Sequence, residues 1–489
     1  MVGKKHRSPS LFTVVPGDLT DFIPKDHILR RVNRALDLSW VTAEVRDAYC
    51  PDNGAPSVDP EVVIRLLIVG YLFDIVHIRE LLREVQVNLA MRWFIGYGLD
   101  ERLPDHSSLS KVADRWGEER FKRIFQRVVR FCIDAGLVEG KQVHIDATLI
   151  RANASWESLV ERPAVPTPAT PSGTGDSASE TDKTNRAGRR KPGRPRSKPP
   201  KIKKQSITDP DATLTTSSHN RTMEPYFKQH TSVDDKHGVI VDVAVTTGEA
   251  SEGGQLLAQI SRVEENTGQK LTVVTCDAGY AYPKNYAELE QRGIDAVIPP
   301  QTENRYVRKL PLRRFRYDAR HQIVRCPQGK IMRRSHEANG NKGWVYRAQA
   351  SDCRNCLLRS RCLSGKTHSR TVMIVNQYEA LLRARRRKAR GWDARTKELY
   401  NRHRWRVEGK HGEAKERHGL RRAVRRGRAK VAIQAYLTAI VMNLKLLAGL
   451  LVAFMNWLTR TIEWGTESPS EPAMGHESSQ NAAVCHRAA

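Results

Sequence analysis

Apolar residues recur every three to four positions between residues 59 and 136, which is the period of an amphipathic helix. Asp59-Pro60 starts this region with a capping side chain and a proline at the first helical position, and Asp105 in PDHSSLSKV supplies a second cap. The pattern predicts an all-α N-terminal domain over residues 1–140. It fits a helix-turn-helix that binds DNA ends as well as a plain packing or dimerisation module.

From residue 141 the pattern changes to short apolar runs separated by helical stretches. Strand patterns rich in β-branched residues or alternating with period two cover 142–150, 224–235, 237–248, 271–276 and 294–300. Helical patterns cover 251–268 and 283–293. This order of strand, hairpin, helix, strand, helix and strand is that of an RNase H-like α/β core. We therefore expect a mixed sheet flanked by helices over residues 141–160 and 207–300.

A proline-rich segment without aromatic side chains interrupts this core at residues 161–206 and ends in RRKPGRPRSKPPKIKK. Such a composition predicts a disordered basic insert. Its centre, Gly193-Arg194-Pro195, resembles the AT-hook arm that lies in the minor groove of DNA. A basic linker without sequence preference fits the same residues. The polar residues 465–489 predict a disordered tail.

The charge balance of the 489-residue chain favours a polyanionic partner, because 82 Lys and Arg against 54 Asp and Glu leave a net charge of +28. An anionic membrane surface or a ribosome-like RNA role would not account for the acids at strand ends described below. Residues 1–17 have no signal-peptide pattern, so we expect a cytoplasmic protein. Polar residues interrupt the apolar stretch Val431–Leu458, which predicts a pair of core helices and no membrane partner.

Three acidic residues stand in special local contexts. Asp146 and Asp277 each follow a short apolar run where a strand should end, and Glu408 lies in a predicted helix among arginines and lysines. Cutting or transferring a phosphodiester needs a nucleophile and charge neutralisation, which two divalent cations about 3.5–4 Å apart provide. Carboxylate oxygens are the ligands such cations prefer. The pattern therefore indicates metal-dependent chemistry on phosphates.

Each acid also has an ordinary structural explanation. An aspartate at a strand end commonly caps a turn, and Glu408 could simply pair with Arg404 or Lys415 on one helical face. Asp209 and Asp211 compete for an acidic role, but they follow the proline-rich insert and not an apolar strand.

Together, the segments PDHSSLSKV, VHIDATLIRANAS, VVTCDAGY and RHRWRVEGKHGEAKERHGLRR, with IVMNLKLL behind them, resemble a bacterial insertion-sequence DDE transposase. The resemblance covers about residues 59–450. It implies that Asp146, Asp277 and Glu408 bind two Mg²⁺ or Mn²⁺ ions. It further implies that water cuts the transposon end and that the freed 3′-hydroxyl attacks target DNA. Paired ends imply a homodimer or a larger assembly on DNA.

The family's last motif also carries an arginine before the glutamate and a lysine after it, which Arg404 and Lys415 match. These residues would contact the DNA backbone near the cut. The family's tyrosine position is occupied by Asn401, and Tyr400 stands one residue earlier. Two basic runs flank Glu408, residues 383–390 and the set Arg421, Arg422, Arg425 and Arg426. Such runs are usually solvated faces, but here they favour a channel that neutralises DNA phosphates.

Four cysteines lie between the second and third acids, at Cys326, Cys353, Cys356 and Cys362. We expect them in a small cysteine-rich β insertion over residues 301–380, followed by C-terminal catalytic helices over 381–464. The set could form a closed zinc site of four thiolates, while reduced cysteines without a metal are the alternative. Cys50, Cys132, Cys276 and Cys485 have the contexts of ordinary buried or tail thiols.

The sequence thus favours a metal-dependent transposase. Its rivals are a DNA-binding protein without catalysis and an RNase H-like nuclease that cuts DNA without joining it.

Overall fold

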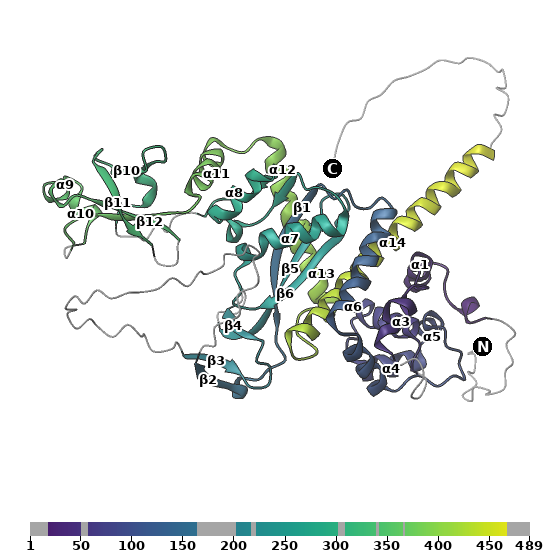
Figure 1. The fold of residues 1–489 in the computed structure, drawn as a ribbon. Coiled ribbons are helices and arrows are strands. Elements are labelled where there is room, and N and C mark those ends of the chain that lie inside the picture. The colour runs from purple at the N-terminus through teal and green to yellow at the C-terminus, as the bar shows by residue number, and fades with distance from the viewer. Residues whose placement is uncertain are drawn as a thin grey trace, which may run out of the picture.

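The computed structural model describes residues 18–49, 57–163, 202–216, 222–301, 309–338, 342–364 and 367–466. Along one axis of the molecule, Figure 1 shows the N-terminal helices at one end, a large sheet in the middle and a second sheet at the far end. The expected AT-hook, residues 1–17 and residues 467–489 lie outside the described residues.

Helices form the N-terminal region, as the sequence predicts. They are α1 (Ile28–Ala35), α2 (Val41–Val45), α3 (Pro60–Leu72), α4 (Ile78–Val87), α5 (Leu89–Ile95) and α6 (His106–Asp134). Both expected caps are confirmed, because Asp59 Oδ1 accepts from the Glu61 amide at 2.7 Å and Asp105 Oδ1 from the Ser107 amide at 2.8 Å. Gly117, with φ of +69°, kinks α6.

The central sheet is mixed and has six strands. They are β1 (Gln142–Arg151), β4 (Thr213–Thr216), β5 (Met223–Asp234), β6 (Ile240–Thr247), β7 (Val273–Thr275) and β8 (Asp295–Val297). β5 pairs antiparallel with β1, β4 and β6, while β7 runs parallel to both β1 and β8. The path β6-β5-β1-β7-β8 therefore places β1 at the centre of the sheet.

Helices cover this sheet. α7 (Glu252–Thr267) packs against β6, β5 and β1, and α8 (Pro283–Gln291) packs against β8. α12 (Ala394–His403) contacts β7 and β8 and leads into α13 (Gly409–Arg417). The predicted mixed sheet flanked by helices is thus confirmed.

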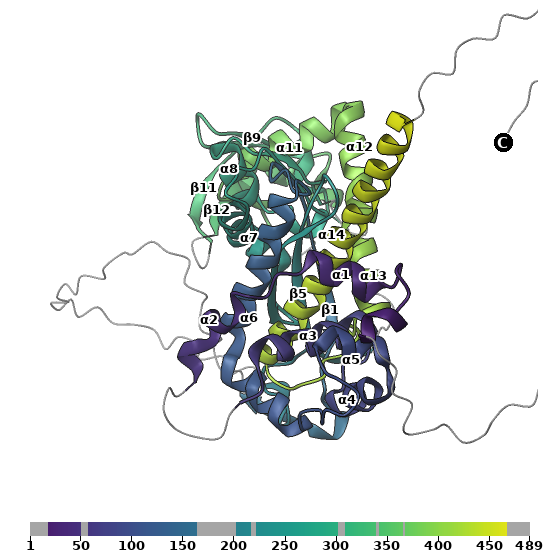
Figure 2. The ribbon, with the colours of Figure 1, turned by 90° about the vertical axis from the view of Figure 1, so that its right-hand side faces the viewer.

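A single long helix, α14 (Arg428–Thr466), joins the N-terminal region to the sheet, since it packs against α1, α3, α6 and β6 (Figure 2). The expected pair of helices over 431–458 is therefore wrong. The polar residues that suggested a break are buried with partners: Gln434 bonds the backbone at Gly419 and Arg422, and Asn443 bonds Ile240. Residues 428–450 are long and apolar enough to span a membrane, but 89% of the relevant window is buried inside the fold.

The ends of the predicted disordered insert form a two-stranded sheet. β2 (Leu159–Pro163) pairs antiparallel with β3 (Ile202–Ser206), which differs from the expectation for residues 161–206. Buried Ser158 and Ser206, whose hydroxyls bond at 2.8 Å, close the base of this pair. The rest of the insert, residues 164–201, lies outside the described residues.

The far sheet is antiparallel and has five strands in the order β13-β12-β11-β10-β9. They are β9 (Arg316–Asp318), β10 (Ile323–Arg325), β11 (Ile331–Glu337), β12 (Gly343–Ala348) and β13 (Thr371–Val375), with α9 (Ala350–Arg354) and α10 (Arg359–Cys362) between the last two. We call these elements the cysteine lobe. α11 (Tyr378–Arg390) follows and packs on α8, which connects the lobe to the core.

Asn443 joins α14 to β6 by bonding both the amide and the carbonyl of Ile240, at 2.9 and 2.8 Å. We expect Asn443→Ala to lower the free energy of unfolding by about 2–4 kcal/mol, because two buried backbone groups lose their partner. Urea denaturation followed by circular dichroism measures the change. Asn401→Ala, at an exposed position of α12, should leave the midpoint nearly unchanged. Equal midpoints for both variants would contradict the assigned role.

Candidate active site

The parallel pairing of β1 with β7 brings Asp146 beside Asp277. The paired residues are Gln142 with Val273, Val143 with Val274 and His144 with Thr275. The same register continued by two residues sets Asp146 opposite Asp277, just where β7 ends. Both side chains are half-buried. The structure therefore brings together the first two acids that the sequence singled out.

Asp277 begins a short 3₁₀ turn, Ala278–Tyr280, and its Oδ1 accepts a hydrogen bond from the Gly279 amide at 2.8 Å. Gly279 leaves space for this arrangement. A Cβ built there would lie 3.0 Å from Asp277 Oδ1 and 2.9 Å from Oε2 of Glu252. Because residue 279 is glycine, the space that a Cβ would fill beside these two carboxylates stays open, and we call this space the hollow at Gly279.

Glu408 comes from a helix that crosses the sheet beside Asp146. A π-helical segment, Arg404–Glu408, links α12 to α13 and contacts β1 and β5. π-helical turns inside α-helices are rare and frequently mark functional sites. The Glu408 side chain is 59% exposed, and its Oε2 lies 3.4 Å from Nε of Arg404. The acid is thus at the open side of the site.

A chain of buried polar side chains fixes α12 to the sheet. His144 on β1 bonds Thr275 at 2.6 Å and Asp235 at 2.9 Å. Thr275 in turn bonds His403 at 3.0 Å, and Asp235 pairs with Arg402 at 2.9 Å. Because His403 and Arg402 immediately precede the π-helical segment, this network sets the position from which Glu408 projects.

The π-helical segment also changes the position of Tyr400. Eight residues of regular α-helix would rotate Tyr400 about 80° away from the face of Glu408, whereas one extra residue in the turn restores the alignment expected for a separation of seven. Burial, followed by the negative charges of Asp277, Glu408 and Asp146 among others, raises the pKa of Tyr400. The Tyr400 side chain therefore lies within electrostatic reach of all three acids despite its one-residue offset in the sequence, while its ring stacks on that of His403 with the centroids 6.1 Å apart.

The acids repel one another. Burial, followed by the charges of Asp277, Glu252 and Glu408, raises the pKa of Asp146 to about 7. Burial and the charge of Glu252 also raise the pKa of Asp277. His411 Nδ1 lies 3.7 Å from Asp146 Oδ2, but burial lowers the pKa of His411 to about 3, so the imidazole is neutral and supplies no counter-charge.

This cluster fits a hard divalent cation by its chemistry. Its ligands are carboxylates, they repel one another in a half-buried site, and the hollow at Gly279 is open between two of them. Within the described residues, no three His, Cys, Asp or Glu side chains stand close enough to hold a metal in their present positions. Binding would therefore require the carboxylates to turn toward the ion.

Glu252 is a member of the cluster that the sequence analysis missed. It is the first residue of α7, after the Ser251 cap, and its charge acts on both Asp146 and Asp277. No apolar strand precedes it, so the strand-end criterion could not find it. The available signal was a glutamate at the start of the helix between the second hairpin strand and β7.

The expected DNA-binding cations are distributed unevenly. Lys415 is half-buried and within electrostatic reach of Asp146, whereas Arg404, Arg421, Arg422 and Arg426 are exposed. The segment at Arg421 and Arg422 lies beside the end of β1 in a parallel bridge, because the Arg151 amide donates to the Arg421 carbonyl at 3.2 Å. Arg425 instead pairs with Asp114 on α6 at 2.7 Å.

The first basic run, on α11, also serves in packing. Arg383 pairs with Glu290 on α8, and Arg387 pairs with Asp295 on β8. Of the competing acids, Asp209 Oδ1 accepts from the Gly427 amide at 3.1 Å and Asp211 Oδ2 from the Arg428 amide at 2.9 Å. Both therefore cap the start of α14 and lie outside the cluster.

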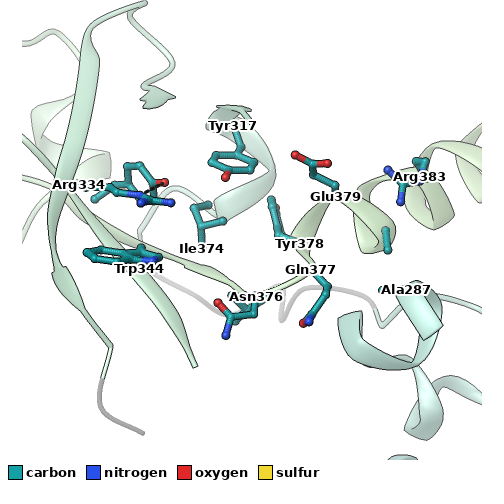
Figure 3. A pocket seen from close by; sticks show the side chains of 13 residues that line it. Ala287, Tyr317, Arg334, Trp344, Ile374, Asn376, Gln377, Tyr378, Glu379 and Arg383 are labelled. Atoms are coloured by element: carbon teal, nitrogen blue, oxygen red, sulfur yellow. Dashed lines mark hydrogen bonds between the residues drawn. The ribbon is translucent and has the colours of Figure 1, made fainter. Parts of the chain in front are cut away.

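The four lobe cysteines line a single cavity of about 30 Å³ and are reduced. Cys132 and Cys276 are fully buried, as expected, and Cys50 and Cys485 lie outside the described residues. A larger opening of about 350 Å³ lies between the lobe and α11, lined by Tyr317, Trp344, Tyr378, Arg334 and others (Figure 3). None of the acids lines it.

Comparisons with known proteins match two parts of the chain to transposase domains. Residues 17–115 match a transposase domain (DUF772), and residues 325–448 match a transposase DDE domain that contains Glu408. A comparison with curated proteins finds no match. Among solved structures, the chain is similar to a piggyBac transposase synaptic complex with hairpin DNA, at 11% identity over 91% of this chain and 80% of that one. The TM-score is 0.32, so that likeness carries no argument.

The raised pKa of Asp146 predicts a pH dependence of stability. Between its ordinary value of 3.8 and its folded value of about 7, the folded protein binds more protons than the unfolded chain, so stability falls as pH rises. Without metal, the melting temperature of the wild type should fall relative to that of Asp146→Asn as the pH rises from 3.8 to about 7. At higher pH the difference between the two melting temperatures should stay constant. Thermal unfolding in EDTA measures this, with surface Asp134→Asn as the control. A constant offset throughout would refute it.

Proposed function

Since its two family matches make this chain an insertion-sequence DDE transposase, we propose that it binds the ends of an insertion sequence, cleaves DNA phosphodiester bonds and joins the 3′-hydroxyl ends to target DNA. The observation that carries this proposal is the position of Asp146 beside Asp277 near the end of β7, with Glu408 within electrostatic reach of Asp146.

An RNase H-like core is part of the proposal. Support comes from the strand path β6-β5-β1-β7-β8, with β1 antiparallel to β5 and parallel to β7. In this arrangement the first acid lies on the central strand and the second at the end of its parallel neighbour. The helical segment that supplies the third acid, Glu408, follows the cysteine lobe in the sequence.

Two Mg²⁺ or Mn²⁺ ions held by the three acids would make water, and later the DNA 3′-hydroxyl, nucleophilic at neutral pH and would neutralise charge on the phosphate. The residues of the chain hold the site in place around them. His411, on α13, bonds Thr231 of the neighbouring strand β5 at 3.1 Å. Its other ring nitrogen lies 3.7 Å from Asp146 Oδ2 and would help to orient that carboxylate. The buried His144–Thr275–His403 chain keeps the Glu408 helix against the sheet.

Cations around the acids would position DNA. In this proposal Arg404, exposed beside Glu408, and Lys415, half-buried and within electrostatic reach of Asp146, contact backbone phosphates near the cut. Arg421, Arg422 and Arg426 extend the basic surface beyond the end of β1. Cleavage and joining of paired ends calls for a homodimer or a larger assembly on the DNA.

Strand transfer by the purified full chain tests the proposal. The substrate is a duplex that carries the element's own end, with Mg²⁺ present, and the variants are Asp146→Asn, Asp277→Asn and Glu408→Gln. We expect each variant to lower joining by about a hundredfold to a thousandfold, because removing one transition-state-stabilising group typically costs two to three orders of magnitude. DNA binding, measured by mobility shift, should survive. Glu398→Gln, at an exposed position of α12 before the π-helical segment, is the matched control.

Two other outcomes separate the rival functions. Cutting without joining by the wild type would replace the proposal with an RNase H-like nuclease. DNA binding without either reaction, unchanged in the three variants, would replace it with a non-catalytic DNA-binding protein.

A further inference from the structure

The two carboxylate oxygens of Glu252 have different surroundings. Lys228 holds Oε1, and Oε2 lies beside the loop that carries Asp277. Nζ of Lys228, on β5, lies 3.0 Å from Glu252 Oε1 and donates to the Ala250 carbonyl at 2.9 Å. Oε2 and Oδ1 of Asp277 both border the space beside Gly279, because a Cβ built there would lie 2.9 and 3.0 Å from them. The ion pair with Lys228 thus engages Oε1, while Oε2 lies on the side of the Asp277 loop.

The approach of α7 to the Asp277 loop is fixed by specific contacts. A Cβ at Gly253 would lie 3.0 Å from the Gly279 carbonyl and 2.9 Å from the Tyr282 ring, so glycine permits the contact. Nδ2 of Asn285 donates to the carbonyls of Gly253 and Tyr280, at 2.8 and 3.0 Å. The first turn of α7 is thereby held against the loop that carries Asp277.

The hydroxyl of Tyr280 is a second, independent sign of a ligand here. Tyr280 is fully buried, and its hydroxyl has no hydrogen-bond partner within the part of the chain that the structure describes. The charges of Asp146, Glu252 and Asp277 reach it. A buried donor without an acceptor costs about 1–3 kcal/mol, so its retention beside three carboxylates indicates that an acceptor arrives when the site is filled.

We propose that Glu252 is a fourth carboxylate of the metal site, sharing the divalent cation with Asp146 and Asp277, an inference that rests on the proposed function. Lys228 holds Oε1, which leaves Oε2 to bind the ion. Tyr280 acquires its acceptor when a carboxylate turns toward the ion.

Binding of Mn²⁺ alone to the full chain tests this without reference to activity. Isothermal titration calorimetry on the wild type, Glu252→Gln and Asp277→Asn should show affinity at least about tenfold lower in both variants. Glu265→Gln, exposed on the same helix, should bind as the wild type does. Melting temperatures in EDTA confirm that the variants are folded. Fe²⁺-driven hydroxyl-radical cleavage should cut the wild-type backbone near both residue 252 and residue 279.

The results distinguish the two levels of the hypothesis. Unchanged Mn²⁺ affinity in Glu252→Gln, with affinity lost in Asp277→Asn, would overturn the role of Glu252 and leave the proposed function standing. Unchanged affinity in both variants, with cleavage at neither segment, would overturn the metal site itself.

The cysteine lobe contains a separate cluster. Cys326, at the turn between β10 and β11, shares its small cavity with Cys353, Cys356 and Cys362 from the α9–α10 segment. The charges of the other three thiols act on Cys362. Lys330, Arg359 and Arg370 line the same cavity, and the two arginines donate to the carbonyls of Cys353 and Cys362 at 3.0 and 3.1 Å.

We infer that this cavity is a structural zinc site, and this inference is independent of the proposed function. The four thiolates would close it by turning toward the ion, because in their present positions no three of them are close enough to hold a metal. Zn²⁺ with four thiolates carries a net charge of −2, which the three cations and the single acid Asp352 balance. α9 and α10 have only five and four residues, too few to be stable alone, so a metal would fasten them to the β10–β11 turn.

Zinc content by atomic emission, after purification with zinc and a reductant, is the test. The wild type should retain one Zn²⁺ per chain, Cys326→Ser and Cys356→Ser should retain little, and Cys132→Ala, a buried thiol outside the lobe, should retain one. Zinc removal should also speed proteolysis within residues 309–375. A wild type that retains no zinc, or Cys326→Ser and Cys356→Ser variants that retain it fully, would overturn the site.

Discussion

The parallel pairing of β1 with β7 is the constraint on which the site depends. Side-chain direction alternates along a strand, so a shift of one residue in this pairing would send one of the two aspartates to the opposite face of the sheet. Apolar β1 and β7 residues such as Val143 and Val274 are buried and hold the register. The position of the chemistry is thus set by hydrophobic packing several residues away from it.

The carboxylates of the site repel one another, whereas the polar side chains that hold the surrounding elements together are paired by hydrogen bonds. Burial and then the charges of Asp277 and Glu252 raise the pKa of Asp146, and burial and the charge of Glu252 raise the pKa of Asp277, while the histidine nearest to Asp146 is kept neutral by burial. The side chains from Asp235 to His403, and those at the Asn443 contacts, are in contrast linked by hydrogen bonds. Groups that would bind an ion carry the unfavourable charge, and groups that hold the scaffold do not.

Sequence patterns predicted the elements well where capping and alternation are local properties, as at Asp59, Asp105 and β6. They also found Asp277, which follows the end of β7. The strand end expected at Asp146 is wrong, because β1 continues to Arg151 through pairing with β5 that the local apolar run does not reveal. They failed for α14, since a buried Asn443 is a helix residue only when β6 is present to bond it. Glu252 was missed for a similar reason, because its neighbours in space come from β5 and from the Asp277 loop.

The π-helical segment before Glu408 has a consequence for comparing related chains. One extra residue in that turn lets α12 and α13 keep their own contacts with the sheet, so a length difference is absorbed locally and is not passed along the helix. Tyr400 lies within electrostatic reach of the acids, although the residue count places Asn401 at the family's tyrosine position. Homologues that differ by a single insertion or deletion at this turn can present identical side chains to the site. Alignments made without a gap there would pair the wrong residues.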